Sequence, residues 1–190
     1  MQLDREKAFA FLAEFAQTQT TIRHGLAMEA AMRAYAGRFG GEPDLWGIVG
    51  LLHDFDNDIH TTPETHPLEG AKILRQRGYP EEVVYAILTH ADYLGLERKG
   101  PLEKALFACD ELTGFITAVA LVRPHKSILE VDVAAVKKKM KDKAFARAVS
   151  RDDIVRGAQG LDVDPDEHID MVIKAMQGRA AELGLEGSAG

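Results

Sequence analysis

The sequence predicts an all-α fold, a single-domain bundle of helices. Proline recurs in front of acidic residues, as at Pro80-Glu81-Glu82 and Pro165-Asp166-Glu167, and a proline in the first turn of a helix sacrifices no hydrogen bond. Sustained polar/apolar alternation, the signature of strands, is missing apart from a short, weak stretch at 128–133. With 190 residues, 46% of them hydrophobic, the chain can bury one sizeable core. We therefore expect one domain over 1–183.

Glycine and proline residues mark the ends and starts of helices in the N-terminal half. The first is expected over 4–18 and the second over 20–38, where methionine and alanine recur at helical spacing before Gly40-Gly41. Pro43 opens a third helix, 43–55, which contains the apolar run 45–52. Two shorter helices follow, 67–77 before Gly78 and 80–91 from Pro80. The acidic segment 56–65 between them is the longest irregular stretch.

The C-terminal half continues in the same way. Gly100-Pro101 opens a long apolar helix, 101–122, which is followed by a helix over 132–148. Ser150 is placed to cap a helix over 151–159, and Asp164-Pro165 opens the last one, 165–183. The metal-site core described below occupies about 20–125, the C-terminal helices 132–183, and 184–190 is expected to be a flexible tail.

Charge and composition exclude several classes of protein. The formal net charge of −7 argues against binding a nucleic acid polymer, which requires clustered Lys and Arg. Cys109 is the one cysteine, so an internal disulfide and a zinc site built on thiolates are both excluded. The N-terminus lacks an apolar signal core, and no run approaches the roughly 20 apolar residues that cross a bilayer. We expect a cytoplasmic protein without membrane contact.

An alanine-rich face on the second helix suggests self-association. Small side chains let helices approach closely, and such faces often pair two copies of a chain. We therefore keep a homodimer as an expectation, based on Ala27, Ala30, Ala31 and Ala34.

The most informative feature is the dipeptide His53-Asp54, at the end of the apolar run 45–52. A single ion could be held by these two side chains together with His24 and Asp110, leaving positions open for water and substrate. Imidazole with carboxylate favours a divalent transition metal, namely Mn, Fe, Co, Ni or Zn, over Mg.

Two further histidines suggest a second ion. His66 precedes the helix 67–77, and His90 closes the helix 80–91. If both turn toward Asp54, that carboxylate can bridge two ions about 3.5–4 Å apart, an arrangement that clamps a phosphoryl group. The sequence thus predicts one or two metal ions.

In their order along the chain, His24, His53-Asp54 and Asp110 resemble the HD-domain metal-dependent phosphohydrolases, over roughly residues 20–125. The resemblance implies an all-helical HD-domain bundle with a metal at the His-Asp pair, and His66 and His90 match the extra histidines of binuclear members. The chain departs from the HD-GYP phosphodiesterases, because Ala91-Asp92-Tyr93-Leu94 replaces the expected second histidine and no Gly-Tyr-Pro follows. It looks closer to small, stand-alone bacterial HD hydrolases.

The expected reaction is hydrolysis of a phosphate ester, plausibly of a nucleotide or another small phosphorylated metabolite, by metal-activated water. Asp58, or less favourably Asp56, could transfer the proton; some HD hydrolases, such as the alarmone hydrolases, keep an acidic residue at the position that corresponds to Asp58. Candidate phosphate contacts are Arg23, Lys104, Arg123 and Lys126.

Two other function classes fit the same residues. One is a di-iron HD-domain oxygenase, since imidazole and carboxylate ligands serve iron and manganese alike. The other is a non-catalytic domain that binds a metal or ligand. Retention of every expected ligand type argues against the non-catalytic domain, whereas the sequence alone does not separate the hydrolase from the oxygenase.

Overall fold

The computed structural model describes residues 3–187, and this part of the chain is helical and contains no strand. The all-α prediction is confirmed. Two short 3-10 helices, η1 (Asp92–Leu94) and η2 (Ile128–Glu130), interrupt the α-helices. The α-helices are α1 (Arg5–Phe15), α2 (Gln19–Phe39), α3 (Pro43–Leu52), α4 (Leu68–Gln76), α5 (Glu81–Leu88), α6 (Pro101–Leu121), α7 (Val133–Met140), α8 (Arg151–Gly160), α9 (Pro165–Gln177) and α10 (Ala180–Leu183).

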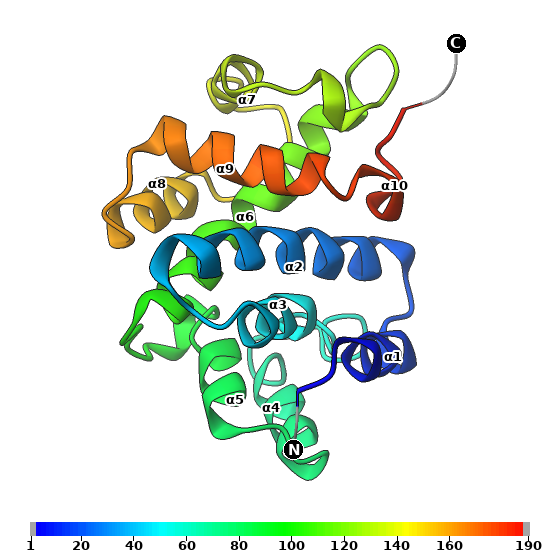
Figure 1. The fold of residues 1–190 in the computed structure, drawn as a ribbon, viewed down its shortest axis with the longest axis vertical. Coiled ribbons are helices and arrows are strands. Elements are labelled where there is room, and N and C mark those ends of the chain that lie inside the picture. Colours follow the sequence, from blue (N-terminus) through cyan, green and yellow to red (C-terminus); the bar gives the residue numbers. More distant parts are fainter. Residues whose placement is uncertain (1–2, 188–190) are drawn as a thin grey trace.

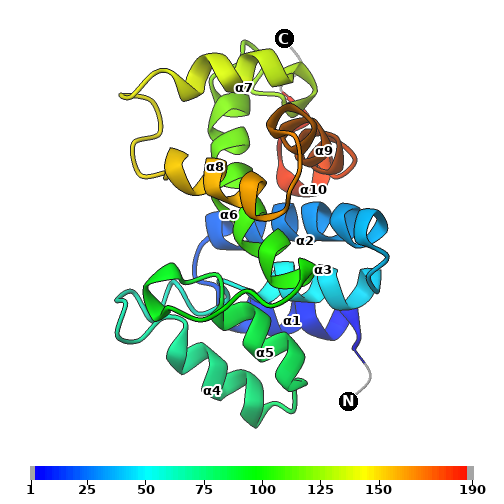
Figure 2. The same ribbon diagram turned by 90° about the vertical axis from the view of Figure 1, so that its left-hand side faces the viewer.

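Helix α2 lies across the middle of the molecule (Figure 1). Helices α1, α3, α4 and α5 lie on one side of it, and α7 to α10 lie on the other. Figure 2 shows α6 running between the two halves, so that α2 and α6 together form the centre. Met28, Met32 and Tyr35 of α2 are fully buried, as expected for a helix covered on both sides.

Two glycines let α2 and α3 approach closely at the point where the two helices carry histidines. A Cβ atom on Gly50 would lie 2.7 Å from the carbonyl oxygen of Met28, and one on Gly25 would lie 2.7 Å from that of Leu51. Any larger residue would push the helices apart. The close crossing brings His24, next to Gly25, beside the end of α3.

The alanine-rich face of α2 packs inside the chain. Ala27, Ala30 and Ala31 are at most 7% exposed, and Ala34 is half-buried. The close packing that these small side chains allow is used within one chain. The argument for a homodimer from this face therefore loses its basis.

Two predicted helices differ most from the structure, whereas the ends of the others shift by at most three residues. The helix predicted over 132–148 ends at Met140 and is followed by turns, in which Arg151 donates hydrogen bonds to the carbonyl oxygens of Asp142, Phe145, Ala146 and Val149. These bonds satisfy carbonyl oxygens that a continuous helix would have used. The helix predicted over 165–183 breaks at Gly178 into α9 and α10. The weakly alternating stretch at 128–133 forms η2 and the start of α7.

Residues 184–187, the first part of the expected tail, pack against η2. Leu185 is 3% exposed, and its carbonyl oxygen accepts a hydrogen bond of 2.8 Å from the Ile128 backbone. Ser127 donates its hydroxyl proton to the carbonyl oxygen of Glu186. The remaining tail residues, 188–190, lie outside the described range.

Between residues 3 and 187 no helix combines the length and the apolar character needed to cross a membrane.

Candidate metal centre

Six side chains from five segments converge beside the crossing of α2 and α3. His24 lies on α2, and His53 is the C-terminal cap of α3. Asp54 follows in the turn after α3, so the helix end lets both members of the dipeptide face the same point. The other three are His66, which precedes α4, His90, which follows α5, and Asp110 on α6.

One half of the cluster consists of His24, His53, Asp110 and one oxygen of Asp54. The His24 Nε2 atom lies 3.2 Å from His53 Nε2 and 3.1 Å from Asp110 Oδ1. Asp54 Oδ2 lies 3.6 Å from His53 Nε2 and 3.9 Å from His24 Nε2. Ligand atoms about 2.1 Å from one ion, at tetrahedral or octahedral angles, are about 3.0–3.4 Å apart. The two spacings between His24 and its neighbours His53 and Asp110 suit a shared ion, whereas those to Asp54 Oδ2 are wider.

The other half consists of His66, His90 and the second oxygen of Asp54. Asp54 Oδ1 lies 3.2 Å from His66 Nε2 and 3.3 Å from His90 Nε2, and the two nitrogens are 3.2 Å apart. Each oxygen of the Asp54 carboxylate therefore faces its own pair of histidines. With metal bound, a carboxylate in this position could bridge two ions.

The orientation of the rings independently fits a metal. The Nδ1 atom of His53 bonds to the carbonyl oxygen of Gly50 at 2.8 Å, and that of His90 bonds to the carbonyl oxygen of Ile87. His66 donates from Nδ1 to Asp56 at 2.9 Å. Metal-binding histidines in proteins are typically held in this way, with one nitrogen donating to a carbonyl or carboxylate and the other free to ligate. The residues present thus fit a divalent metal.

Electrostatics also favour cations in this cluster. Burial alone would raise the pKa of the Asp54 carboxyl, but the three surrounding imidazoles hold it well below its usual range. Burial would likewise lower the pKa of His66, yet Asp54 and Asp56 raise it to about 9. Neutral pH therefore leaves Asp54 ionised and His66 protonated in the metal-free protein.

Asp56 orients His66 from behind. Its side chain is completely buried, Oδ1 accepts the hydrogen bond from His66, and Oδ2 accepts one of 3.1 Å from the Gly70 backbone. Both oxygens are thus engaged within the chain.

Asp58 ties the loop after α3 to the start of α2. Its carboxylate accepts hydrogen bonds from the backbone of Gln17 (2.7 Å) and Thr18 (2.9 Å) and from the hydroxyl of Thr21 (2.8 Å). Burial acts to raise the pKa of Asp58, and these three donors lower it below its ordinary value. The Asp58 carboxylate is therefore held ionised beside Thr21, one helical turn before His24 on α2.

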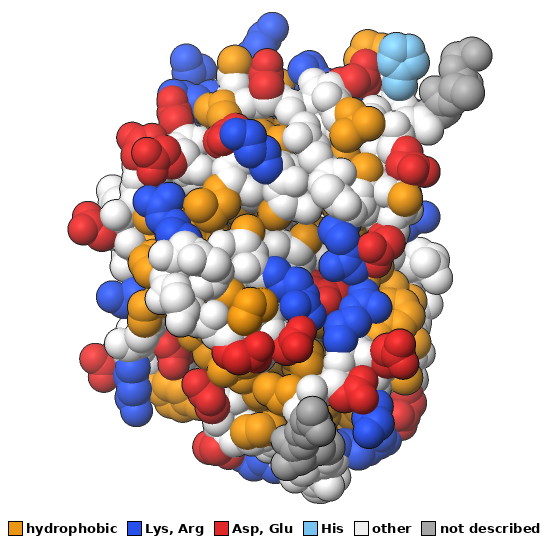
Figure 3. Space-filling model, in the orientation of Figure 1, with side chains coloured by type: hydrophobic (Ala, Val, Ile, Leu, Met, Phe, Trp, Pro, Cys, Tyr) orange, Lys and Arg blue, Asp and Glu red, His pale blue; other side chains and the backbone are white. Residues whose placement is uncertain are grey.

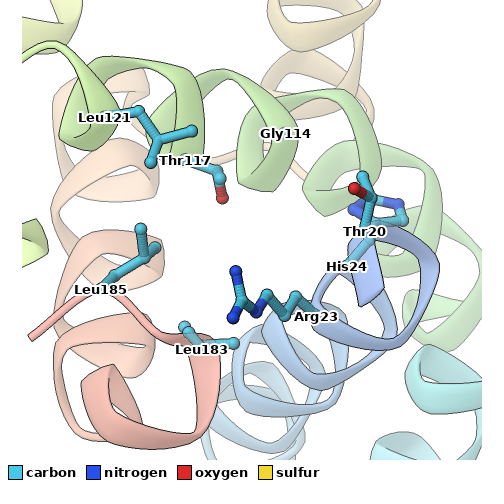
Figure 4. A pocket seen from close by; sticks show the side chains of 8 residues that line it. All are labelled: Thr20, Arg23, His24, Gly114, Thr117, Leu121, Leu183 and Leu185. Carbon is cyan, nitrogen blue, oxygen red and sulfur yellow. The ribbon is translucent and has the colours of Figure 1, made fainter. Parts of the chain in front are cut away.

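A pocket of about 240 Å³ opens beside His24 (Figure 4). Arg23 extends into it, and among the described residues its guanidinium forms neither a hydrogen bond nor an ion pair. The pocket is lined by Thr20, Arg23, His24, Gly114, Thr117, Leu121, Leu183 and Leu185. Of the predicted phosphate contacts, Arg23 is the one that the structure places at this pocket.

The other three predicted phosphate contacts lie apart from the pocket lining. Lys104 is half-buried in the first two turns of α6. Arg123 donates two hydrogen bonds to the carbonyl oxygen of Glu130 and so closes the turn after α6. Lys126 is exposed in that turn, with a φ of 53°.

Sequence reasoning missed several groups that support the cluster. Gly70 approaches Asp56 so closely that a Cβ atom there would lie 2.5 Å from Asp56 Oδ2. Tyr93 donates its phenolic proton to the carbonyl oxygen of His66. The carbonyl partners of His53 and His90 lie three residues before them, in the last turn of a helix, where carbonyl oxygens lack helical partners. A histidine directly after a helix is the sequence signal that could have identified these bonds.

Comparison with known proteins places this cluster in a family. Residues 21–114, which include all six converging side chains, match the family model of the HD domain. Ribonuclease Y of Desulfotalea psychrophila is 27% identical over 139 residues, which are 70% of this chain and 26% of that protein. The chain thus matches about a quarter of the length of this relative. No solved structure matches significantly. By its family match and its helical fold, the chain belongs to the HD-domain superfamily.

Proposed function

We infer that the chain is a phosphohydrolase that uses two divalent transition-metal ions to cleave a small phosphate ester. The observation that carries this proposal is the placement of the Asp54 carboxylate, whose two oxygens face His24 with His53 on one side and His66 with His90 on the other. Asp110 completes the first group. HD domains are commonly metal-dependent hydrolases, which supports the same conclusion.

The chain's own residues have distinct roles in this proposal. When bound, divalent metal ions would lower the pKa of a water molecule and offset the charge of the phosphoryl oxygens. Arg23, next to His24, is placed to bind a phosphoryl oxygen with its free guanidinium. Asp56 and Asp58 keep His66 and α2 in position, because their carboxylates already accept hydrogen bonds from the chain.

A small substrate suits the surroundings of the cluster better than a nucleic acid polymer. The relative named Ribonuclease Y carries the name of an RNA-cleaving enzyme, but a polyanion needs a track of cations, and Arg23 is the single Lys or Arg of the described pocket lining. On the face drawn in Figure 3, basic side chains lie interspersed with acidic ones. The net charge of −7 acts in the same direction.

The experiment is elemental analysis of protein purified without a histidine tag, followed by a panel of phosphate monoesters with Mn²⁺, Co²⁺, Ni²⁺ and Mg²⁺. We expect two transition-metal ions per chain and hydrolysis that disappears when His53→Ala removes a ligand. Tightly held iron with oxygen uptake and no hydrolysis would support the di-iron oxygenase instead. A chain that binds metal but turns over neither oxygen nor esters would be a binding domain.

A further inference from the structure

The pocket beside the metal centre continues along the same face of α2 that carries His24. Arg23 and His24 lie three and four residues after Thr20, so both can face the same side of the helix as Thr20. In Figure 4 the Arg23 guanidinium lies between His24 and the leucines of the opposite wall. A molecule that extends from the metal centre into the pocket therefore passes Arg23 first.

Helix α6 provides the second wall by the same spacing. Gly114, Thr117 and Leu121 follow the metal-facing Asp110 at intervals of four, three and four residues. Thr117 donates its hydroxyl proton to the Thr113 carbonyl oxygen at 2.9 Å, so toward the pocket it offers only an acceptor. This wall becomes less polar with distance from Asp110.

The third wall comes from the C-terminal segment, beyond the matched family region 21–114. Leu183 and Leu185 are 2% and 3% exposed, and the segment is held by the backbone bond between Leu185 and Ile128. Gly184 has a φ of 65°, and a Cβ there would lie 2.9 Å from Arg23 Cζ, so the glycine gives the guanidinium its space. This segment makes the pocket a feature of this chain beyond the family region.

We propose that this pocket holds the alcohol portion of the phosphate ester and that this portion is an apolar alkyl or aryl group. The proposal rests on the proposed function, since it places the phosphoryl end at the metal centre and beside Arg23. Three leucines and no carboxylate line the pocket. With Arg23 directed at the phosphoryl end and His24 at the metal centre, the side chains of Thr20 and Thr117 are the polar groups left in the described lining, so a strongly polar alcohol portion would lose more hydrogen bonds to water than it could regain.

Gly114 is the position from which a side chain could fill the pocket. It lines the pocket, and a Cβ atom there would meet nothing within 4 Å, so the first atom of a leucine side chain is free of close contacts. Gly37 on the exposed surface of α2 is the matched control, because a Cβ there also meets nothing within 4 Å. Both replacements remove a helical glycine.

The experiment measures binding of methyl-, propyl- and pentylphosphonate to the Mn²⁺-loaded protein by calorimetry. Burial of each added methylene in an apolar pocket should tighten binding by roughly fourfold. We expect this gradient in the unmodified protein and in Gly37→Leu. In Gly114→Leu the gradient should vanish, because the leucine side chain would occupy the space that the alkyl chains fill.

Equal affinities for the three phosphonates in the unmodified protein would overturn the proposal, whether or not Gly114→Leu folds. A gradient that persists in Gly114→Leu would also overturn the proposal. Loss of the gradient in the control Gly37→Leu would do the same. Hydrolysis of methyl and pentyl phosphate is measured in parallel to separate the two proposals. A gradient in binding without any hydrolysis would contradict the proposed function alone, whereas hydrolysis without a gradient would contradict the pocket assignment alone.

Discussion

At the scale of single residues, the proposal of two ions depends on the placement of Asp54. Its Oδ2 faces His24 and His53, and its Oδ1 faces His66 and His90, at distances of 3.2–3.9 Å. No other carboxylate among the described residues faces both pairs. The number of bound ions is therefore coupled to this one side chain.

We expect Asp54→Asn to lower the metal content from two ions per chain to at most one. The amide keeps the shape of the carboxylate but offers a single neutral oxygen, so one group of ligands loses its anion. Elemental analysis of the purified variant provides the measurement, with Asp44→Asn, an exposed carboxylate on α3, as control. Two ions retained in Asp54→Asn would contradict its bridging role.

The pKa of His66 predicts that metal binding releases protons. Asp54 and Asp56 outweigh burial and raise this pKa to about 9, so His66 is protonated in the metal-free protein at pH 7 and must lose a proton to ligate. Metal affinity should rise between pH 7 and pH 9 by about tenfold per pH unit for each released proton. Titration calorimetry in buffers of different ionisation enthalpy measures the release, and a heat that is independent of the buffer would refute it.

The raised pKa of His66 makes the metal-free fold less stable as the pH rises, whereas metal affinity increases. A raised pKa stabilises the folded state fully below the unfolded value of 6.5, and this contribution is lost as the pH rises through about 9. Raising the pH should thus lower the stability of the metal-free protein and raise its affinity for metal.

Asp58→Asn distinguishes positioning from proton transfer. If Asp58 only holds the loop to α2, the variant should lose about 1 kcal/mol of stability and keep the pH profile of kcat. If it transfers a proton, kcat should fall by roughly 10²–10⁴-fold, with one limb of the profile missing. Our assignment predicts the first result, measured by urea unfolding and steady-state kinetics.

At the scale of elements, α4 controls one ligand through a close backbone approach. Gly70 in its first turn donates its N–H to Asp56, which in turn holds His66. The helix start and the metal centre are therefore mechanically connected. A side chain at position 70 has no space, since its Cβ would lie 2.5 Å from Asp56 Oδ2.

We expect Gly70→Ala to displace the Asp56 carboxylate and to weaken binding of the second ion by roughly 10–100-fold, the usual effect of losing a group that orients a ligand. The first ion, held by residues of α2, α3 and α6, should keep its affinity. Metal titration measures both steps. Gly37→Ala, in open space on α2, is the control for replacing a helical glycine. An unchanged second step would show that Asp56 does not orient His66.

At the scale of the whole molecule, His168 of α9 joins the two central helices. Its Nδ1 accepts a hydrogen bond from the Tyr35 hydroxyl on α2, and its Nε2 donates one of 3.1 Å to the Ala108 carbonyl oxygen on α6. His168 is 1% exposed. Burial lowers its pKa to about 4, so the imidazole stays neutral in the folded protein at neutral pH.

This burial should make the fold sensitive to acid. A lowered pKa contributes stability above the unfolded value of 6.5, and the contribution is lost as the pH falls toward about 4, because the unfolded chain gains a proton first. Between pH 8 and pH 5 the loss amounts to about 2 kcal/mol. The His168→Gln variant should lack this loss. The difference in unfolding free energy between the unmodified protein and the variant, both metal-free and measured by urea unfolding, should therefore be about 2 kcal/mol smaller at pH 5 than at pH 8. A difference independent of pH would refute the assignment.

The helices were predictable because their signals are local. Proline at the first turn, glycine after the last turn and serine or aspartate caps act within a few residues, and Pro43, Pro101 and Ser150 begin or cap helices as expected. The prediction of one helix over 132–148 failed where the chain turns after Met140. There Arg151 bonds to the carbonyl oxygens of Ala146 and Phe145, a side-chain contact that helix patterning does not reveal.

The sequence by itself determined the helical class, the family resemblance and the kinds of metal ligand, since these depend on residue type and order. Only the tertiary structure decided that the two oxygens of Asp54 face different histidine pairs and that Asp56 and Asp58 are occupied by bonds within the chain. It also decided that Leu185, far from Arg23 in the sequence, shares a pocket with it. The physical reason is that helix formation depends on neighbours along the chain, whereas coordination and pocket shape depend on distances between side chains that packing alone brings together.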